Sequence, residues 1–444
     1  MTGGLKEPKI PGTRKMTRCF FSHHAKCAVL IATSMILTAC GGGGGGGSTI
    51  ASSTVASSGG SVSAYYPRSP VGTLVPAPPI TGNVLPVAVD AGPVPGTSQI
   101  NIAYVSVTVC IPGTSGTSCQ TIDHVQLDTG SSGLRLLNSA LYANLNLPTV
   151  TQNGKAVGEC TPFAIGTTWG SVLSADIYLA GEVARSVPVQ IIGDRPGGAL
   201  YVPQDCVNTG ALENNQTQLG ANGILGIGLF INDCIGCQNA ASPIPAAYYT
   251  CTTAGCTNAT VTTTQMVTNP VALFPTDNNG ELIDLPPVSP GGLNGLFGSL
   301  VFGINTQSNN QLGSAIKYAT NTSGNFSTTF NGSKNTGYID SGSNGLFFYD
   351  ANISACQTNT WAYCPTPSPM TLSAINIAAP GTPSGTVSFT IENVDQLGVG
   401  IVAANIAGLS AAGQFSWGLP FFFGRRVFTA ISSSPIPSGS YWAY

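Results

Sequence analysis

The stretch Leu127-Asp-Thr-Gly-Ser-Ser-Gly-Leu-Arg-Leu136 occurs a second time, with changes, as Ile339-Asp-Ser-Gly-Ser-Asn-Gly-Leu-Phe-Phe348. The two copies agree at five of ten positions, and the exchanges of Leu for Ile and of Thr for Ser are conservative. A duplicated unit related by pseudo-symmetry would bring two such loops together. The repeat therefore predicts that two distant aspartates, Asp128 and Asp340, face one another in the folded chain.

Two carboxyl groups in contact favour one kind of chemistry. They cannot both ionise cheaply, so they share one proton and titrate as a unit. One member of such a pair can then deprotonate a water molecule while the other protonates a carbonyl oxygen. The glycine that follows each copy's hydroxyl residue allows the tight turn that holds the carboxyl close to the facing loop. The repeat thus indicates a pair of carboxyl groups that can activate a water molecule.

The composition and the hydrophobic pattern predict an all-β fold. Only 7% of the 444 residues are charged, which excludes long solvated helices and a cationic nucleic-acid surface, while 56 Gly and 31 Pro indicate many turns. Residues 101–109 alternate apolar and polar side chains with β-branched residues, as half-buried strands do, and residues 121–127 alternate again. The best candidates for short helices are residues 134–147 and 394–409.

The first 40 residues predict a leader segment. Six cations precede an apolar run over residues 28–39 that is too short to span a bilayer permanently. Leu37-Thr-Ala-Cys40 resembles the bacterial lipobox, which implies that Cys40 is acylated and starts the mature chain, and Gly41 implies retention at the outer membrane. An ordinary signal peptide that contains a cysteine is the alternative. Residues 41–85, which begin with seven glycines, predict a mobile tether.

Ten cysteines follow Cys40, and an exported chain would hold them as disulfides. Neighbouring positions suggest Cys110 with Cys119 and Cys356 with Cys364, which leaves Cys160 for Cys206. The remaining four have spacings that either two disulfides or a zinc site would fit, and we expect disulfides and no metal. These four are Cys234, Cys237, Cys251 and Cys256. The sequence alone does not establish the connectivity.

Further motifs, taken with the two aspartate loops, resemble the pepsin-like aspartic peptidases. Asn222-Gly-Ile-Leu-Gly-Ile-Gly228 is similar to the apolar-Gly motif of the first lobe, and Gly298-Ser-Leu-Val-Phe-Gly-Ile-Asn305 to the strand that opens the second. The segment that starts Trp417-Gly-Leu-Pro is similar to the final apolar-Gly motif. The chain also looks like an uncharacterised family of bacterial lipoproteins with a domain of unknown function. The resemblance covers about residues 100–430.

This resemblance implies a bilobal, pepsin-like double β-barrel with pseudo-two-fold symmetry and a central cleft. The lobes would span residues 86–290, with a cysteine-bearing insertion at 230–270, and residues 291–444. Asp128 and Asp340 would activate the catalytic water, without any cofactor. The supporting loop residues would be Thr129, Gly130, Ser131, Ser341, Gly342 and Ser343. The hydroxyls of Thr129 and Ser341 would grip the facing loop, and those of Ser131 and Ser343 would bond the outer carboxylate oxygens.

The sequence departs from the family at the substrate-covering hairpin. Ile165 occupies the position of the family's flap tyrosine, and Gly166 and Trp169 are the other flap candidates. Arg135 replaces an aromatic residue after the first loop, and its charge would lower the pKa of Asp128 if the two side chains were paired.

The sequence is compatible with two hypotheses of function. One is a lipid-anchored aspartic peptidase of the cell envelope, monomeric, which takes a peptide or protein substrate in the inter-lobe cleft and binds no nucleic acid. The other is an inactive binding or structural lipoprotein that keeps both loops as fold elements. Other hydrolase chemistry would depend on His124, the only histidine after the leader, and a structural strand residue fits that position better.

Overall fold

The computed structural model describes residues 65–77, 82–97, 99–237, 241–432 and 439–444. The predicted leader, Cys40 and most of the predicted tether lie outside these residues. Residues 65–77 of the predicted tether pack as a strap on the first lobe. There Arg68 Nη1 donates to the Leu145 carbonyl at 2.7 Å and its Nε to Asn138 Oδ1 at 3.0 Å.

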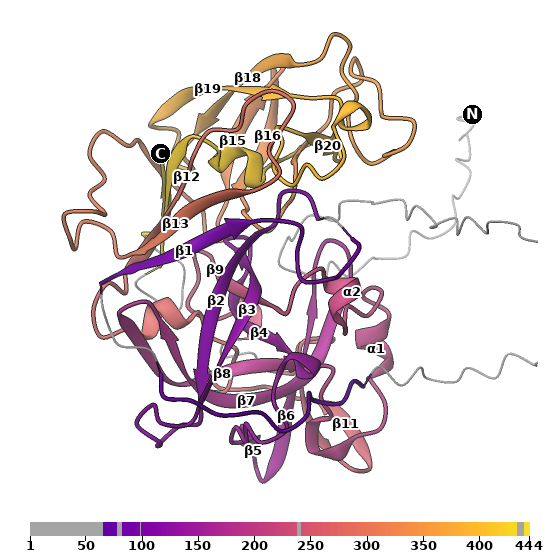
Figure 1. Cartoon of the computed structure of the whole chain (residues 1–444), viewed down its shortest axis with the longest axis vertical. Coiled ribbons are helices and arrows are strands. Elements are labelled where there is room, and N and C mark those ends of the chain that lie inside the picture. The colour runs from indigo at the N-terminus through magenta and orange to yellow at the C-terminus, as the bar shows by residue number, and fades with distance from the viewer. Residues whose placement is uncertain (1–64, 78–81, 98, 238–240, 433–438) are drawn as a thin grey trace, which may run out of the picture.

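The described residues form two sheets, and Figure 1 shows the two lobes that they build, one in indigo to pink and one in orange to yellow. The larger sheet contains β1 (Val84–Val89), β2 (Ala103–Cys110), β3 (Cys119–Asp128), β4 (Ser132–Leu137), β5 (Thr151–Gln152), β6 (Lys155–Pro162), β7 (Thr167–Leu179), β8 (Glu182–Ile192), β9 (Gly223–Ile227), β10 (Tyr248–Thr252), β11 (Gly255–Asn258), β12 (Gly280–Leu285), β13 (Leu296–Phe302), β14 (Lys317–Ala319), β22 (Arg425–Ala430) and β23 (Tyr441–Ala443). The smaller sheet contains β15 (Phe326–Phe330), β16 (Ser333–Ile339), β17 (Leu346–Phe348), β18 (Met370–Ile377), β19 (Ser384–Ile391), β20 (Ala407–Leu409) and β21 (Gln414–Trp417).

Six strands of the larger sheet close into a barrel. Their order is β2-β3-β9-β4-β8-β7, and β7 pairs with β2 again to complete the ring. Beyond β2, the sheet continues through β1 and β13 to β12 and β22, so strands from both ends of the chain run side by side between the lobes (Figure 1). The smaller sheet is open and builds the second lobe. The predicted all-β, two-lobed architecture is thus confirmed.

Helix is scarce in the described part of the chain, where it amounts to α1 (Gln204–Val207), α2 (Gln216–Leu219) and six 3₁₀ turns. Both expected short helices are wrong. Residues 134–147 contain most of β4 and a 3₁₀ turn at Asn138–Ala140, and residues 394–409 contain a 3₁₀ turn at Val394–Gln396 and then β20. The reason in the first case is that β4 is buried on both faces between β8 and β9, so its apolar residues do not reveal a strand period.

The main apolar cluster of the core reaches through both lobes. In the second lobe its centre is aromatic. Phe348 stacks on Phe415 with ring centroids 5.1 Å apart, and Phe415 contacts Trp417 at 4.4 Å. Buried aromatic rings contribute large apolar areas, and their pairing adds roughly 0.5–1.5 kcal/mol per pair. This packing holds β21 beside β16, the strand that leads to Asp340.

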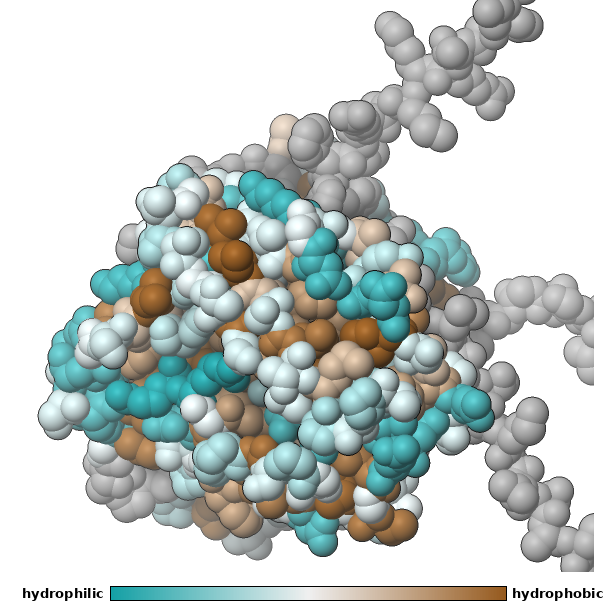
Figure 2. Space-filling view, turned by 90° about the horizontal axis from the view of Figure 1, so that it is seen from above, coloured by the Kyte–Doolittle hydropathy of each residue, from teal (hydrophilic) through white to brown (hydrophobic). Residues whose placement is uncertain are grey.

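The surface carries little charge, as the composition requires. Figure 2 shows pale and hydrophobic residues interspersed with hydrophilic ones over the face seen from above. Ser, Thr, Gly and Asn therefore supply much of the water-facing surface.

All ten cysteines after Cys40 form disulfides, and the three suggested pairs are confirmed: Cys110–Cys119, Cys160–Cys206 and Cys356–Cys364. The other four form Cys234–Cys237 and Cys251–Cys256. The zinc interpretation of these four fails because their sulfurs are bonded to one another. The predicted insertion is part of the sheet, since β10 pairs with β6 and with β11.

Candidate active site

Each repeated loop follows a strand that pairs in parallel with a second strand of its own lobe. In the first lobe, β3 ends at Asp128, which lies opposite Gly226 of β9. In the second, β16 ends at Ile339, opposite Trp417 of β21, and Asp340 follows directly. The loops then receive equivalent backbone hydrogen bonds, from Gly228 N to the Ser131 carbonyl and from Leu419 N to the Ser343 carbonyl, both at 2.8 Å. The sequence repeat is therefore also a structural repeat.

The two carboxyl groups have matching hydrogen bonds. Asp128 Oδ1 accepts from Gly130 N at 2.8 Å, and Asp340 Oδ1 accepts from Gly342 N at 2.9 Å. The outer oxygens accept from serines: Asp128 Oδ2 from Ser131 Oγ, and Asp340 Oδ2 from Ser343 Oγ at 2.7 Å. These contacts have the geometry that the sequence predicted for the supporting serines.

The carboxyl groups face each other across the two glycines. A Cβ added to Gly130 would lie 2.5 Å from Asp340 Oδ1, and one added to Gly342 would lie 2.5 Å from Asp128 Oδ1. Each carboxyl thus contacts the glycine of the other loop, which is why no side chain fits there. Asp128 and Asp340 consequently form the facing pair that the repeat predicted.

Burial and the neighbouring charge of Asp340 raise the pKa of Asp128 to about 7, and the hydrogen bonds from Ser131 and Gly130 offset part of this rise. Asp128 is only 7% exposed, whereas Asp340 is half-buried. A carboxyl that keeps its proton to near neutral pH beside a second carboxyl can act as a general acid while its partner acts as a base.

The two loops are joined by reciprocal hydrogen bonds between Thr129 and Ser341. Thr129 N donates to Ser341 Oγ at 3.0 Å, and Ser341 N donates to Thr129 Oγ1 at 2.9 Å. Ser341 Oγ also donates to the Leu127 carbonyl at 2.7 Å. Both side chains are buried, so water cannot replace these bonds without cost. The predicted grip between the loops is present in full.

Removal of one grip hydroxyl should weaken the fold measurably. Ser341→Ala leaves the buried Thr129 N and the Leu127 carbonyl without partners, and each such group costs about 1–3 kcal/mol. We expect the free energy of unfolding, measured by urea denaturation, to fall by at least about 2 kcal/mol. The control is Ser333→Ala, an exposed serine on β16. An equal loss in both variants would contradict the role given to the grip.

A family model described as "Protein of unknown function (DUF3443)" matches residues 79–444, which include both loops, the strands that carry them and the grip. The chain belongs to this family. Among solved structures, the chain is similar to an aspartic proteinase from Irpex lacteus, with 14% identity, a TM-score of 0.44, and coverage of 81% of this chain and 96% of that chain. No curated protein matches.

The hairpin formed by β6 and β7 places the three flap candidates of this DUF3443 protein differently. Ile165 lies at the tip and is 64% exposed, and Gly166 closes the turn, its carbonyl accepting from Phe163 N at 2.7 Å. Trp169 is fully buried and packs edge-to-face on Tyr249, at 5.1 Å between ring centroids. Trp169 is therefore a core residue of β7, where it pairs with Cys160 of β6, and it does not replace a flap side chain.

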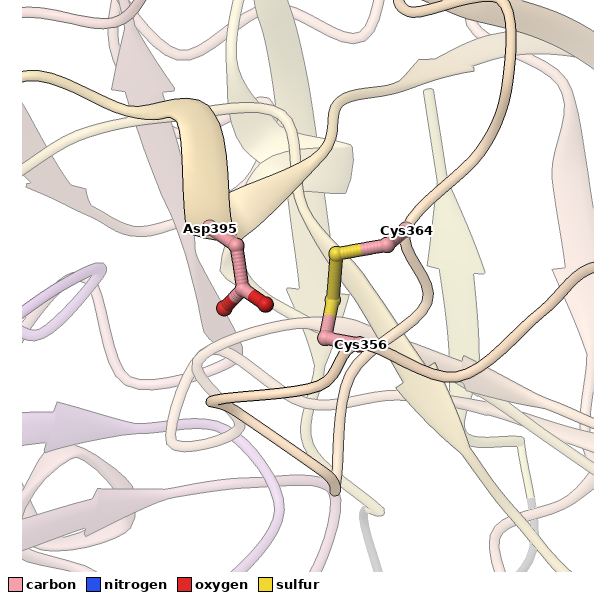
Figure 3. A group of neighbouring side chains, drawn as sticks. All are labelled: Cys356, Cys364 and Asp395. Carbon is pink, nitrogen blue, oxygen red and sulfur yellow. A yellow bond between two sulfur atoms is a disulfide. The ribbon is translucent and has the colours of Figure 1, made fainter.

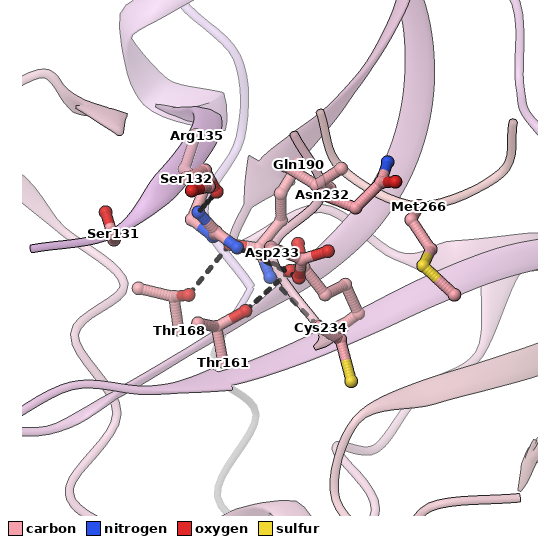
Figure 4. Close-up of polar contacts among 12 residues, drawn as sticks. Ser131, Ser132, Arg135, Thr161, Thr168, Gln190, Asn232, Asp233, Cys234 and Met266 are labelled. Carbon is pink, nitrogen blue, oxygen red and sulfur yellow. Dashed lines mark hydrogen bonds and ion pairs between the residues drawn. The ribbon is translucent and has the colours of Figure 1, made fainter. Parts of the chain in front are cut away.

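Arg135 of the DUF3443 protein is not paired with Asp128. It is fully buried, and its Nη2 contacts Glu159 Oε1 at 2.7 Å and Asp233 Oδ2 at 3.2 Å. Figure 4 shows Arg135 beside Asp233. The idea that its charge would lower the pKa of Asp128 is therefore wrong. The physical reason is that β4 turns this side chain toward the hairpin and the 228–237 segment, which supply two carboxyl groups.

Two polar contacts near the loops were not predicted from the sequence. Gln126 Nε2 donates to the Gly342 carbonyl at 3.0 Å, which adds a further link between the lobes. Asn101, fully buried and with φ of 55°, donates to the carbonyls of Asn344 and Ala404, both at 2.8 Å. An asparagine just before a strand was the one local signal for such a conformation, because asparagine tolerates positive φ.

Two other polar groupings do not form metal or catalytic sites. His124 lies between Asp90 and Asp123, with ring nitrogens 3.4 and 3.3 Å from their carboxylates, so both ring nitrogens face carboxylates. Cys356, Cys364 and Asp395 lie together (Figure 3), but the two sulfurs are bonded to each other. The Asp395 carboxylate accepts backbone N–H groups, that of Thr358 first among them, and these bonds lower its pKa.

Proposed function

We propose that this DUF3443 protein is an aspartic peptidase that hydrolyses peptide bonds with a water molecule held between Asp128 and Asp340. The observation that carries the proposal is the facing carboxyl pair, fixed by reciprocal hydrogen bonds between Thr129 and Ser341. The raised pKa of Asp128, caused by burial and the charge of Asp340, supports a general acid at this pair.

In the proposed reaction, Asp128 carries the shared proton and Asp340 is the carboxylate. Asp340 takes a proton from the water as its oxygen forms a bond to the scissile carbonyl carbon, and Asp128 donates its proton to the carbonyl oxygen. The resulting tetrahedral diol then collapses. Its C–N bond breaks, the amine nitrogen accepts the proton held by Asp340, and one diol hydroxyl returns its proton to Asp128 as the carboxyl product forms and leaves. The pair ends with one proton, as it began, and needs no cofactor.

One observation favours a second candidate, a binding or structural module that cuts nothing. Asp128 is only 7% exposed, so little of its carboxyl group is accessible to a substrate. Incubation of the purified protein with unfolded protein and a diverse peptide library, between about pH 3 and 7, distinguishes the two. New termini that are absent with the aspartate variants described below support the peptidase, and none with a folded wild type supports the binding module.

We further propose that the protein is a monomeric lipoprotein of the bacterial envelope, anchored at Cys40 and retained at the outer membrane. The leader would be residues 1–40 and the tether residues 41–85, with lobes over 86–290 and 291–444. The support is the charge and apolar pattern before Cys40 and the five disulfides, which fit an oxidising compartment. Within the described residues, no helix has the length and apolar character to cross a bilayer.

The anchor proposal predicts a modified N-terminus. Intact-mass analysis should find a mature chain that begins at Cys40 with acyl chains attached, and the protein should sediment with membranes. Cys40→Ser should release it into the soluble fraction, because stable anchoring needs the acyl groups. Cys27→Ser, within the predicted leader, is the matched control. An unacylated N-terminus at another residue would refute the anchor.

A further inference from the structure

A buried ionic cluster lies next to the first catalytic loop. Its centre is Arg135 on β4, which follows that loop and is fully buried. Its Nη2 contacts Glu159 and Asp233, and its Nη1 donates at 2.9 Å to the carbonyl of Ser132, the first residue of β4 after the loop. Figure 4 shows Arg135 with Ser132 and Asp233. Arg135 is therefore bonded directly to the backbone that carries Asp128 and Ser131.

The same cluster holds the β6–β7 hairpin. Glu159 lies on β6, and its Oε1 accepts from Thr161 Oγ1 at 2.6 Å as well as from Arg135. The ring of Phe163, next to the hairpin tip, lies 5.7 Å from Arg135 Cζ. One guanidinium group thus lies against Glu159 and the ring of Phe163, and Glu159 links it to Thr161, all in the segment that leads to Ile165.

A third segment completes the cluster. Asp233 adjoins the Cys234–Cys237 disulfide, and its Oδ1 accepts from Tyr248 OH at 2.6 Å. Tyr248 OH in turn accepts from Val267 N at 2.8 Å, and Tyr248 belongs to β10, which pairs with β6. The insertion is therefore bonded to the hairpin through both main chain and side chains.

The charged groups of the cluster indicate its role in the fold. Two carboxyl groups face one guanidinium, and burial together with the charge of Glu159 raises the pKa of Asp233 well above its usual range. Arg135 is thus the cation that contacts both carboxyl groups of the cluster. Well-packed apolar residues stabilise a fold at least as well as a buried ion pair does, whereas an ion pair also fixes relative position. The directional bonds suit a positioning role.

We propose that Arg135 is a positioning residue which couples the β6–β7 hairpin to the catalytic loop, so that the placement of the hairpin tip and the geometry of the dyad depend on one buried cluster. The inference rests on the proposed peptidase function for its kinetic consequence. Its structural consequence, a hairpin held by Arg135, does not.

The test uses a triple variant of the full chain, Arg135→Met with Glu159→Gln and Asp233→Asn. It removes the guanidinium together with both carboxyl groups, so no buried charge is left without a partner. The matched control is Arg185→Met with Asp176→Asn, which removes a pair joined at 2.8 Å on β7 and β8, away from the catalytic loop. Each protein is measured for amide hydrogen exchange over residues 160–167 and for kcat and KM on a peptide substrate.

The cluster variant should remain folded, exchange its hairpin amides at least tenfold faster, and lose at least tenfold in kcat with a smaller change in KM. The control should match the wild type in both. Hairpin exchange and kcat that stay at wild-type values in a folded cluster variant would overturn the proposal and make the cluster structural only. If the wild type cleaves nothing, the peptidase function fails, but hydrogen exchange still decides whether Arg135 holds the hairpin.

Discussion

Asp128→Asn and Asp340→Asn should each reduce peptide hydrolysis at least about 10³-fold, because either change removes one half of the proton exchange. The amide is nearly isosteric with the carboxyl and keeps an oxygen for the glycine and serine donors of its loop. The fold should therefore survive. The measurement is kcat/KM on a peptide that the wild type cleaves, together with circular dichroism of each variant.

The dependence of peptide hydrolysis on pH should also reflect the pair of Asp128 and Asp340. Activity should fall above about pH 7 as the proton of Asp128 is lost, and fall again in acid when both carboxyls are protonated. Because the folded pKa of Asp128 is raised, its ionisation destabilises the fold as pH rises from about 4 toward 7. Asp128→Asn removes that ionisation, so we expect the variant to be more stable than the wild type at neutral pH.

Asp123→Asn is the control for these variants, since Asp123 lies on the same strand, β3, and its side chain is 69% exposed. It should cleave at the wild-type rate. Cleavage that persists in either dyad variant would point to another site or to a contaminating peptidase. A folded wild type that cleaves nothing would leave the binding module as the function of this site.

Glu281 should make the protein lose stability as pH rises. This residue of β12 is fully buried opposite Thr429, and burial raises its pKa well above the usual range, an effect that the Thr429 hydroxyl offsets only in part. Above about pH 4.3 the unfolded chain releases this proton before the folded chain does, so unfolding becomes easier. The free energy of unfolding should fall by about 1.4 kcal/mol per pH unit until the folded pKa is reached.

Glu281→Gln isolates this effect because glutamine keeps the shape and cannot ionise. Urea denaturation between about pH 4 and 9 should show a smaller loss of stability with pH in the variant than in the wild type. Asp284→Asn removes an exposed carboxyl, 49% accessible, from the same strand and serves as the control. If the free energy of unfolding fell equally with pH in the wild type and in Glu281→Gln, Glu281 would not be the cause of the loss at high pH.

Much of the site was predictable from local sequence. The repeat around Asp128 and Asp340 placed the two carboxyls, and the adjoining hydroxyls and glycines placed the grip. Short spacings indicated Cys110–Cys119 and Cys356–Cys364, where the intervening chain can form little more than a turn. The two short disulfides close over 9 and 8 residues, and the carboxyl, glycine and serine of each loop lie within three positions of one another, so local backbone geometry arranges them. The two loops are 212 residues apart, and the sequence repeat is what predicts that they meet.

The sequence by itself thus determined the all-β class, from alternation and turn residues, and the facing dyad and the grip, from a repeat whose two copies are 212 residues apart. Two copies of one motif predict their own meeting by pseudo-symmetry, whatever their separation along the chain. Only the tertiary structure decided that Arg135 pairs with Glu159 and Asp233, and that Trp169 is a core residue. These outcomes depend on which segments, from 24 to 98 residues apart, meet around a buried side chain. A buried charge takes the partners that packing brings to it, and no local pattern specifies them.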